Sequence, residues 1–175
     1  MIEQAPSPPP VQPEKISILE VAVLRSNINA TDKYLKQIVY PSLTHWHITH
    51  QSAYLPHDKK CNIRMQIVCE GADEQGVRLG IDGNFLLEFA FEIEDLSDHV
   101  TQKEDGGMLV NAILGATLIG LCISTARGLI LERTRGSYLG GLILPVQNPM
   151  QYLKSTINDS ITTLPVSEVE KENVV

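Results

Sequence analysis

The sequence predicts an α+β fold, in which an antiparallel β-sheet carries a long helix and a short C-terminal helix packed on one face. Residues 61–69 and 77–93 alternate between apolar and polar side chains, as half-buried antiparallel strands do. Residues 106–126 follow without one charged side chain, and this stretch is long enough for a long buried helix. Strands that come first and helices that come later favour an α+β arrangement.

The predicted strands differ in how regular their pattern is. Residues 16–24 are apolar and β-branched, but their apolar side chains fall on both faces, which a β-bulge or two-sided burial explains. Residues 77–93 keep their apolar set in phase, which predicts one long strand with a bulge at Gly83. A hairpin with a three-residue loop over residues 82–84 also keeps the phase and stays open as an alternative.

Residues 26–60 give a poor secondary-structure signal. We expect a short helix over 32–39 with Thr31 as its N-cap, followed by a connection without regular structure. Connections of this length in compact domains are often functional. This one carries the single tryptophan of the chain, Trp46, and also Tyr54.

The uncharged stretch is predicted to be one helix that continues to Arg135, with Gly136 as a left-handed residue at its end. Every fourth residue along one of its ridges is small, which allows another backbone to approach closely. These predicted oligomer-interface residues are Ala112, Ala116, Gly120, Ser124 and Gly128. One modest sheet covers one side of such a helix only, so we expect further copies of the chain to cover the other side in a homo-oligomer.

A single-pass membrane anchor over residues 106–126 is the alternative. Acidic residues precede the stretch and Arg127 follows it, which agrees with the positive-inside rule for membrane-spanning helices. Asn111 and Ser124 interrupt its apolar character, and no tryptophan or tyrosine marks either end. We therefore favour burial in protein, without stable membrane insertion.

Composition places this domain between two tails. The Pro-rich residues 1–14 and the acidic residues 155–175 are predicted to be disordered, which leaves 15–154 as one domain. No basic and apolar signal segment opens the chain, so we expect a cytoplasmic protein. A net charge of −7 argues against nucleic acid as a partner.

No catalytic, cofactor or metal motif stands out, so we expect neither an enzyme nor a cofactor. His45 and His47 would point to one side of an extended segment, but His50 is the only other histidine nearby and no third ligand of suitable geometry is evident. We expect exposed histidines in a loop. The cysteines are predicted to be reduced thiols in the core, because no Cys-x-x-Cys spacing occurs; they are Cys61, Cys69 and Cys122.

Several short motifs resemble the SecB family of protein-export chaperones. They are the end of the uncharged helix at residues 135–138, the segment 142–146, and Asn148-Pro149 at the start of a final short helix. Trp46 before the second alternating strand adds to the resemblance, which covers residues 16–153.

This resemblance implies a function. SecB proteins are homotetramers, dimers of dimers, whose long helices lie between two outer sheets. They bind unfolded precursor proteins without ATP, in apolar grooves, and hold them competent for export, so the implied partners are unfolded clients and a SecA-type motor ATPase. A SecB-like chaperone dedicated to one client, such as an antitoxin, is an open alternative. The residues at matching positions for client binding are Trp46, Tyr54, Met150, Tyr152 and Leu153.

Overall fold

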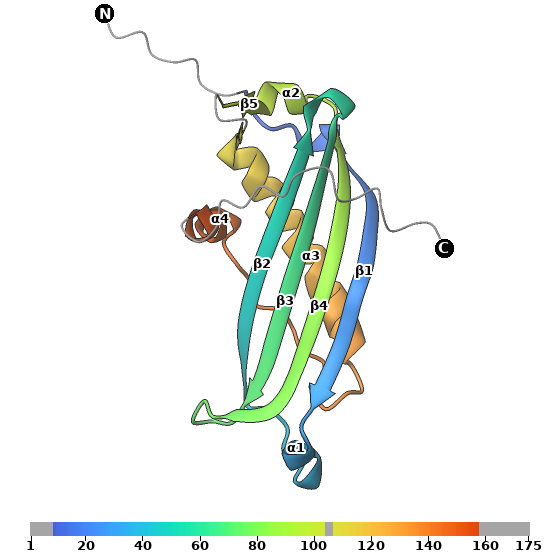
Figure 1. The fold of residues 1–175 in the computed structure, drawn as a ribbon, viewed down its shortest axis with the longest axis vertical. Helices are drawn as coiled ribbons and strands as arrows, with labels where there is room; N and C mark the ends of the chain where they lie inside the picture. The colour runs from blue at the N-terminus through green and yellow to red at the C-terminus, as the bar shows by residue number, and fades with distance from the viewer. Residues whose placement is uncertain (1–8, 104–106, 158–175) are drawn as a thin grey trace, which may run out of the picture.

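The computed structural model describes residues 9–103 and 107–157, and Figure 1 shows its elements. The main sheet consists of β1 (Ile16–Ala30), β2 (Leu43–Leu55), β3 (Lys60–Ala72) and β4 (Arg78–Ile93). The α-helices are α1 (Asp32–Lys36), α2 (Leu96–His99), α3 (Ala112–Thr134) and α4 (Pro149–Ile157). Two short 3-10 turns, Pro13–Lys15 and Pro56–Asp58, and a small hairpin of β5 (Val100–Gln102) and β6 (Met108–Val110) complete the order.

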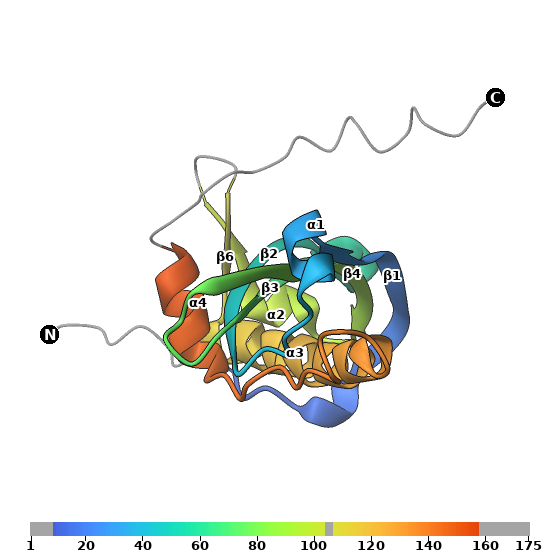
Figure 2. The ribbon, with the colours of Figure 1, turned by 90° about the horizontal axis from the view of Figure 1, so that it is seen from below.

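All four long strands form one antiparallel sheet in the order β1-β4-β3-β2. Both α3 and α4 lie on the same side of it (Figure 2). The α+β prediction, an antiparallel sheet with a long and a short helix on one face, is confirmed. Because β1 and β2 are adjacent in sequence but at opposite edges, the chain between them crosses over one end of the sheet.

Strand β1 contains the irregularity that its two-sided apolar pattern predicts. Its register against β4 shifts between Ile18 and Glu20 and again between Val23 and Arg25. Each shift returns the next apolar residues to the face that carries α3. The extra residues, Leu19 and Leu24, are about half exposed.

One long strand, β4, replaces the hairpin alternative, but the predicted bulge at Gly83 is wrong. Gly83 pairs with Cys69 in an unbroken stretch of the β3–β4 ladder. A β-carbon built on Gly83 would lie 2.7 Å from Cys69 Sγ and 2.9 Å from Phe85 Cε2. The position is a glycine because the core leaves no space for a side chain there.

The helix expected over residues 32–39 ends at Lys36, and the expectation of an irregular connection from there to residue 56 is wrong for most of its length. Residues 43–55 form β2, which pairs with β3 in register along all thirteen residues. His45 and His47 therefore lie on a strand and not in a loop. The pattern missed β2 because the side of the strand toward α3 mixes Trp46 and Ile48 with Thr44 and His50.

Helix α3 lies across the inner face of the sheet and buries one of its sides there. Leu114, Leu118, Cys122 and Ile130 are among its buried residues and pack with the apolar side chains of β3 and β4. The helix is long and apolar enough to cross a bilayer by length and composition. Its start was predicted too early, because residues 108–110 form β6.

The ends of α3 carry the expected signals. Asn111 caps the first turn by accepting a hydrogen bond from the Ile113 N–H at 2.9 Å. At the other end, Gly136 has a φ of +78°, which confirms the left-handed residue predicted there.

A segment without regular structure, residues 142–148, leads from the lower end of α3 to α4 (Figure 1). Its Leu144 is fully buried, and Pro149 opens α4 as predicted. Residues 155–157, assigned to the predicted acidic tail, form the last turn of α4. Of the predicted N-terminal tail over 1–14, residues 9–14 are described; Val11 packs against the core, and residues 13 and 14 belong to the turn Pro13–Lys15. Residues 1–8 and 158–175 of the predicted tails lie outside the described residues.

Candidate functional site

The crossover segment between β1 and β2 is fixed to the sheet at both of its ends. Thr31 N–H donates to the Gly80 carbonyl at 2.8 Å, and Ser42 N–H donates to the Ala72 carbonyl at 3.0 Å. A β-carbon on Gly80 would lie 2.5 Å from Thr31 Oγ1, so the crossover begins where a strand residue lacks a side chain. Thr31 also caps α1 as predicted, by accepting from the Tyr34 N–H.

The crossover and the first residue of β2 expose large apolar side chains at the lower end of the molecule, where α1 lies in Figure 1. We call this surface the crossover patch; it consists of Leu35, Ile38, Val39, Tyr40 and Leu43, which are 45–66% exposed. Tyr34, 2% exposed, is the one buried side chain of α1, and its ring lies edge-on to that of Tyr138 at 6.0 Å. A contiguous surface of such side chains usually marks a binding site.

A second candidate surface lies where α4 meets the edge strand β2. Tyr152 on α4 donates a hydrogen bond to the Ile48 carbonyl at 3.3 Å, and its hydroxyl lies 3.2 Å from His50 Nδ1. On its other side α4 approaches α3, where a β-carbon on Gly115 would lie 3.3 Å from Leu153 Cδ1. Thus α4 closes the space between the β2 edge and α3.

The predicted client-binding residues are brought together in part. Trp46, Tyr54, Met150, Tyr152 and Leu153 are all partly buried. Trp46 and Tyr54 lie on the side of β2 that faces α3, but eight residues apart, which is about 26 Å along a strand. Tyr152 contacts the middle of this strand, between the two.

The small residues predicted at an oligomer interface lie on the side of α3 turned away from the sheet. Ala112, Ser124 and Gly128 are exposed, whereas Ala116 and Gly120 are half-buried. The large apolar residues Ile113 and Leu121 are 51% and 36% exposed. A β-carbon on Gly120 would lie 3.3 Å from Pro149 Cγ, so this position borders α4.

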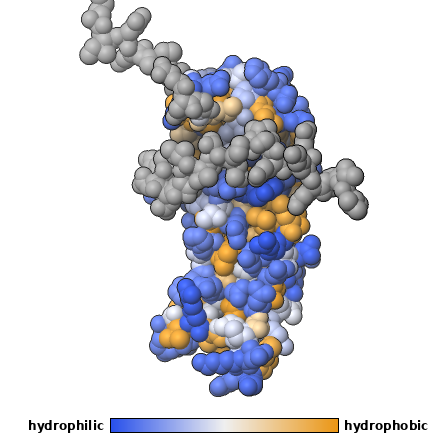
Figure 3. Space-filling view, in the orientation of Figure 1, coloured by the Kyte–Doolittle hydropathy of each residue, from blue (hydrophilic) through white to orange (hydrophobic). Residues whose placement is uncertain are grey.

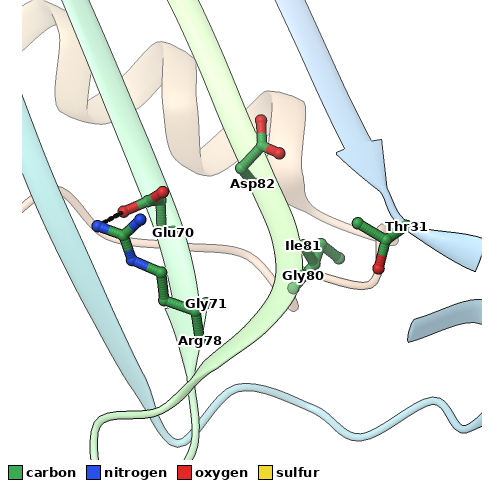
Figure 4. Close-up of a pocket in the computed structure, with 7 residues that line it drawn as sticks. All are labelled: Thr31, Glu70, Gly71, Arg78, Gly80, Ile81 and Asp82. Carbon is green, nitrogen blue, oxygen red and sulfur yellow. Dashed lines mark ion pairs between the residues drawn. The ribbon is translucent and has the colours of Figure 1, made fainter. Parts of the chain in front are cut away.

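The outer face of the sheet is mostly hydrophilic, with apolar side chains between the polar ones (Figure 3). A hollow of about 80 Å³ lies near its lower end, lined by Thr31, Glu70, Gly71, Arg78, Gly80, Ile81 and Asp82 (Figure 4). Arg78 pairs with Glu70 at 2.9 Å, and Asn29 donates to Asp82 at 2.9 Å. The hollow is far below the roughly 300 Å³ of a usual ligand pocket, and both its carboxylates have partners.

His45 and His47 share the outer face of β2, as the prediction for an extended segment requires, while His50 points to the opposite face. In residues 9–103 and 107–157, no group of three His, Cys, Asp or Glu residues is arranged to hold a metal ion.

The three cysteines are buried and free. Burial raises the pKa of Cys61 to about 12 and that of Cys69 to about 11, and it also raises the pKa of Cys122. Such thiols stay protonated near neutral pH and act as small apolar side chains.

Comparison with known proteins identifies the fold. No protein-family model and no curated protein sequence matches the chain. The solved structure of the Mycobacterium tuberculosis Rv1957 SecB-like chaperone, in complex with a ChAD peptide from the Rv1956 HigA1 antitoxin, matches with a TM-score of 0.54 and 12% identity. The match covers 77% of this chain and 92% of that one. The fold is SecB-like.

A protein of unknown function from Streptococcus agalactiae matches 75% of this chain and 97% of its own, at 16% identity. Its TM-score of 0.34 is too low to support an argument. At 12% identity, the likeness to the SecB-like chaperone concerns the fold alone.

Sequence reasoning missed the crossover patch. Leu35, Ile38 and Val39 follow one another at helical spacing, but α1 ends at Lys36, so these side chains do not all reach the core. The available signal was an apolar run directly before Pro41, in a segment too short to form a buried helix.

Proposed function

We propose that the protein is a holdase chaperone, which binds unfolded precursor proteins without ATP and keeps them competent for export. The crossover patch carries this proposal, because it gathers five exposed apolar side chains at one end of a SecB-like fold. Covering one half-exposed Leu or Ile side chain with a client contributes about 1 kcal/mol. Several such contacts, each tolerant of sequence, suit a protein that binds many unfolded segments.

The edge of β2 offers a second set of contacts. It lies at the end of the sheet, so the backbone groups on its outer side have no strand partner among the described residues, although the Ile48 carbonyl accepts a hydrogen bond from Tyr152. An extended client segment can add to such an edge and direct alternate side chains toward Trp46 and Ile48. Tyr152, Met150 and Leu153 of α4 would then border the client from the other side.

We further propose a homotetramer, a dimer of dimers, in which the exposed side of α3 is covered by other copies of the chain. This side combines the small residues Ala112, Ser124 and Gly128 with the exposed Ile113 and Leu121. Small residues let a second helix approach closely, and the large ones supply apolar area to bury.

The single-pass membrane alternative has less support. To cross a bilayer, α3 would have to leave the sheet, which would uncover the apolar side chains of β3 and β4. Phe85, Phe89 and Phe91 alone each bury at least 99% of their surface there. The cost of exposing them in water is several kcal/mol.

A chaperone dedicated to one client, such as an antitoxin, is the second candidate, and the antitoxin peptide bound to the SecB-like neighbour favours it. Affinities for several unrelated unfolded proteins separate the candidates. Similar affinities indicate a general export factor, and one tight client among weak ones indicates a dedicated chaperone.

Docking to a SecA-type motor ATPase in the cytoplasm stays a prediction. Acidic residues of the outer sheet face are candidates for it, but Glu88 is already paired with Arg64 at 2.6 Å, so fewer free carboxylates remain.

Aggregation of a chemically denatured client after dilution tests the proposed activity. We expect the purified protein to suppress aggregation without ATP, and Trp46→Ala and Tyr152→Ala to weaken suppression while native mass and circular dichroism stay unchanged. Val146→Ser, at an 87% exposed apolar position distant in sequence from the crossover, is the control. Equal suppression by the wild type and both variants would remove these residues from the site.

A further inference from the structure

The contact between α4 and β2 contains a partly buried histidine, His50. His50 lies on the face of β2 toward α3, opposite Met65 of β3, and its ring lies 5.3 Å from that of Tyr152 on α4. Among the described residues, the other titratable side chains on this face of β2, β3 and α3 are Tyr54, Cys61, Cys69 and Cys122.

These neighbours are neutral at physiological pH. Burial raises the pKa of Tyr54 and of the three thiols, so none of them supplies a negative charge near the imidazole. Burial also lowers the pKa of His50, with no charged group contributing to that shift. Among the residues that the structure describes, a protonated His50 would therefore have no counter-charge beneath α4.

The hydrogen bonds define the neutral form of the ring. The Ile48 carbonyl only accepts, so the single hydroxyl proton of Tyr152 is donated to it. His50 then donates its Nδ1 proton to the Tyr152 oxygen across 3.2 Å, and Nε2 is unprotonated. A second proton, on Nε2, makes the ring a cation that is more stable in water than beneath the helix.

We propose that His50 is the positioning residue for α4, which it holds against β2 through Tyr152 while its ring is neutral. When α4 is detached, the ring is solvated and titrates near the ordinary histidine pKa of about 6.5. As pH falls through and below that value, the detached form takes up the proton first, so acidification shifts the equilibrium toward detachment. The inference does not require that the protein bind a client.

Backbone amide hydrogen exchange of α4 in the full chain without client, corrected for intrinsic pH dependence, tests this proposal. In the wild type, we expect protection of α4 to fall several-fold between pH 7.5 and pH 5.5, while β3 amides stay protected. His50→Gln, which keeps a donor but cannot become charged, should lose this pH dependence. The matched control, His47→Gln on the opposite face of the same strand, should behave like the wild type.

Tyr152→Phe is a second variant, because it removes the hydroxyl and leaves the imidazole in place. It should lower α4 protection at pH 7.5 and still show a further fall at pH 5.5. A wild type whose α4 protection is the same at both pH values would overturn the proposal, as would a pH dependence that persists in His50→Gln. If His50→Gln does not fold, the proposal is tested by the α4 protection of the wild type and of Tyr152→Phe at the two pH values.

Discussion

Gly71 on β3 lies directly against Pro41 of the crossover segment. A β-carbon built on Gly71 would lie 2.6 Å from Pro41 Cγ and 2.8 Å from Ile81 Cγ2. The crossover passes over the sheet at a point where the strand has no side chain, and this close approach sets the position of the crossover patch.

Gly71→Ala should therefore destabilise the protein by about 1–3 kcal/mol, since the added methyl group overpacks a rigid proline ring. Denaturant unfolding measures the change. Pro41→Ala in the same chain should recover part of the loss, because it removes the ring that the methyl group meets. Strictly additive effects of the two substitutions would show that the contact does not determine the cost.

Tyr40→Ser should weaken client binding and leave stability almost unchanged. Tyr40 is 66% exposed within the crossover patch, so the folded chain gains little from its ring, whereas a client would cover it. We expect a loss of about 1–2 kcal/mol in binding free energy, or roughly five- to thirtyfold in affinity, by fluorescence titration of an unfolded client. The control is Val146→Ser. A similar loss of affinity in this variant would mean that any exposed apolar residue contributes to client binding, and not the crossover patch in particular.

Gly128→Leu should disrupt assembly without unfolding the subunit. In the isolated chain, nothing lies within 4 Å of a β-carbon at Gly128, so a side chain fits the monomer. At a close helix contact between subunits, leucine would separate the two backbones. Light scattering should show a smaller native mass than for the wild type, while Arg133→Leu, on a different side of α3, keeps the wild-type mass.

Alkaline pH should destabilise the fold through its buried thiols. An unfolded cysteine titrates near pH 8.5, whereas folded Cys61 keeps its proton up to about pH 12. Between these values the unfolded chain holds fewer protons than the folded one, so the free energy of unfolding falls as pH rises. Cys61→Ala should show a shallower fall between pH 8.5 and 11 in denaturant titrations. Equal slopes would contradict this account of the thiol.

Much of the fold could be predicted because the central strands β3 and β4 and the helix α3 each bury a defined set of side chains in the core. Alternation located β3 and β4, where alternate residues point into the core, and the uncharged stretch located α3. The edge strand β2 escaped because its half-buried face includes His50 and Thr44, which a hydropathy pattern counts as polar.

The candidate site could be predicted only in part. Tyr152 was named from a motif, but its partner His50 lies 102 positions away, and no local pattern reveals such a contact. The crossover patch depends on which apolar residues fail to reach the core. That outcome follows from α1 ending after five residues and from the chain crossing the sheet at Gly71. Hydrophobic periodicity in the sequence predicts neither of these features.

The most direct test of the central claim is the native mass of the purified protein in detergent-free buffer, alone and with a permanently unfolded client. We predict a species of four times the 19.3 kDa chain mass, which gains the mass of the client without ATP. A monomer that takes up no client, or material that stays dispersed only in detergent, would contradict the account.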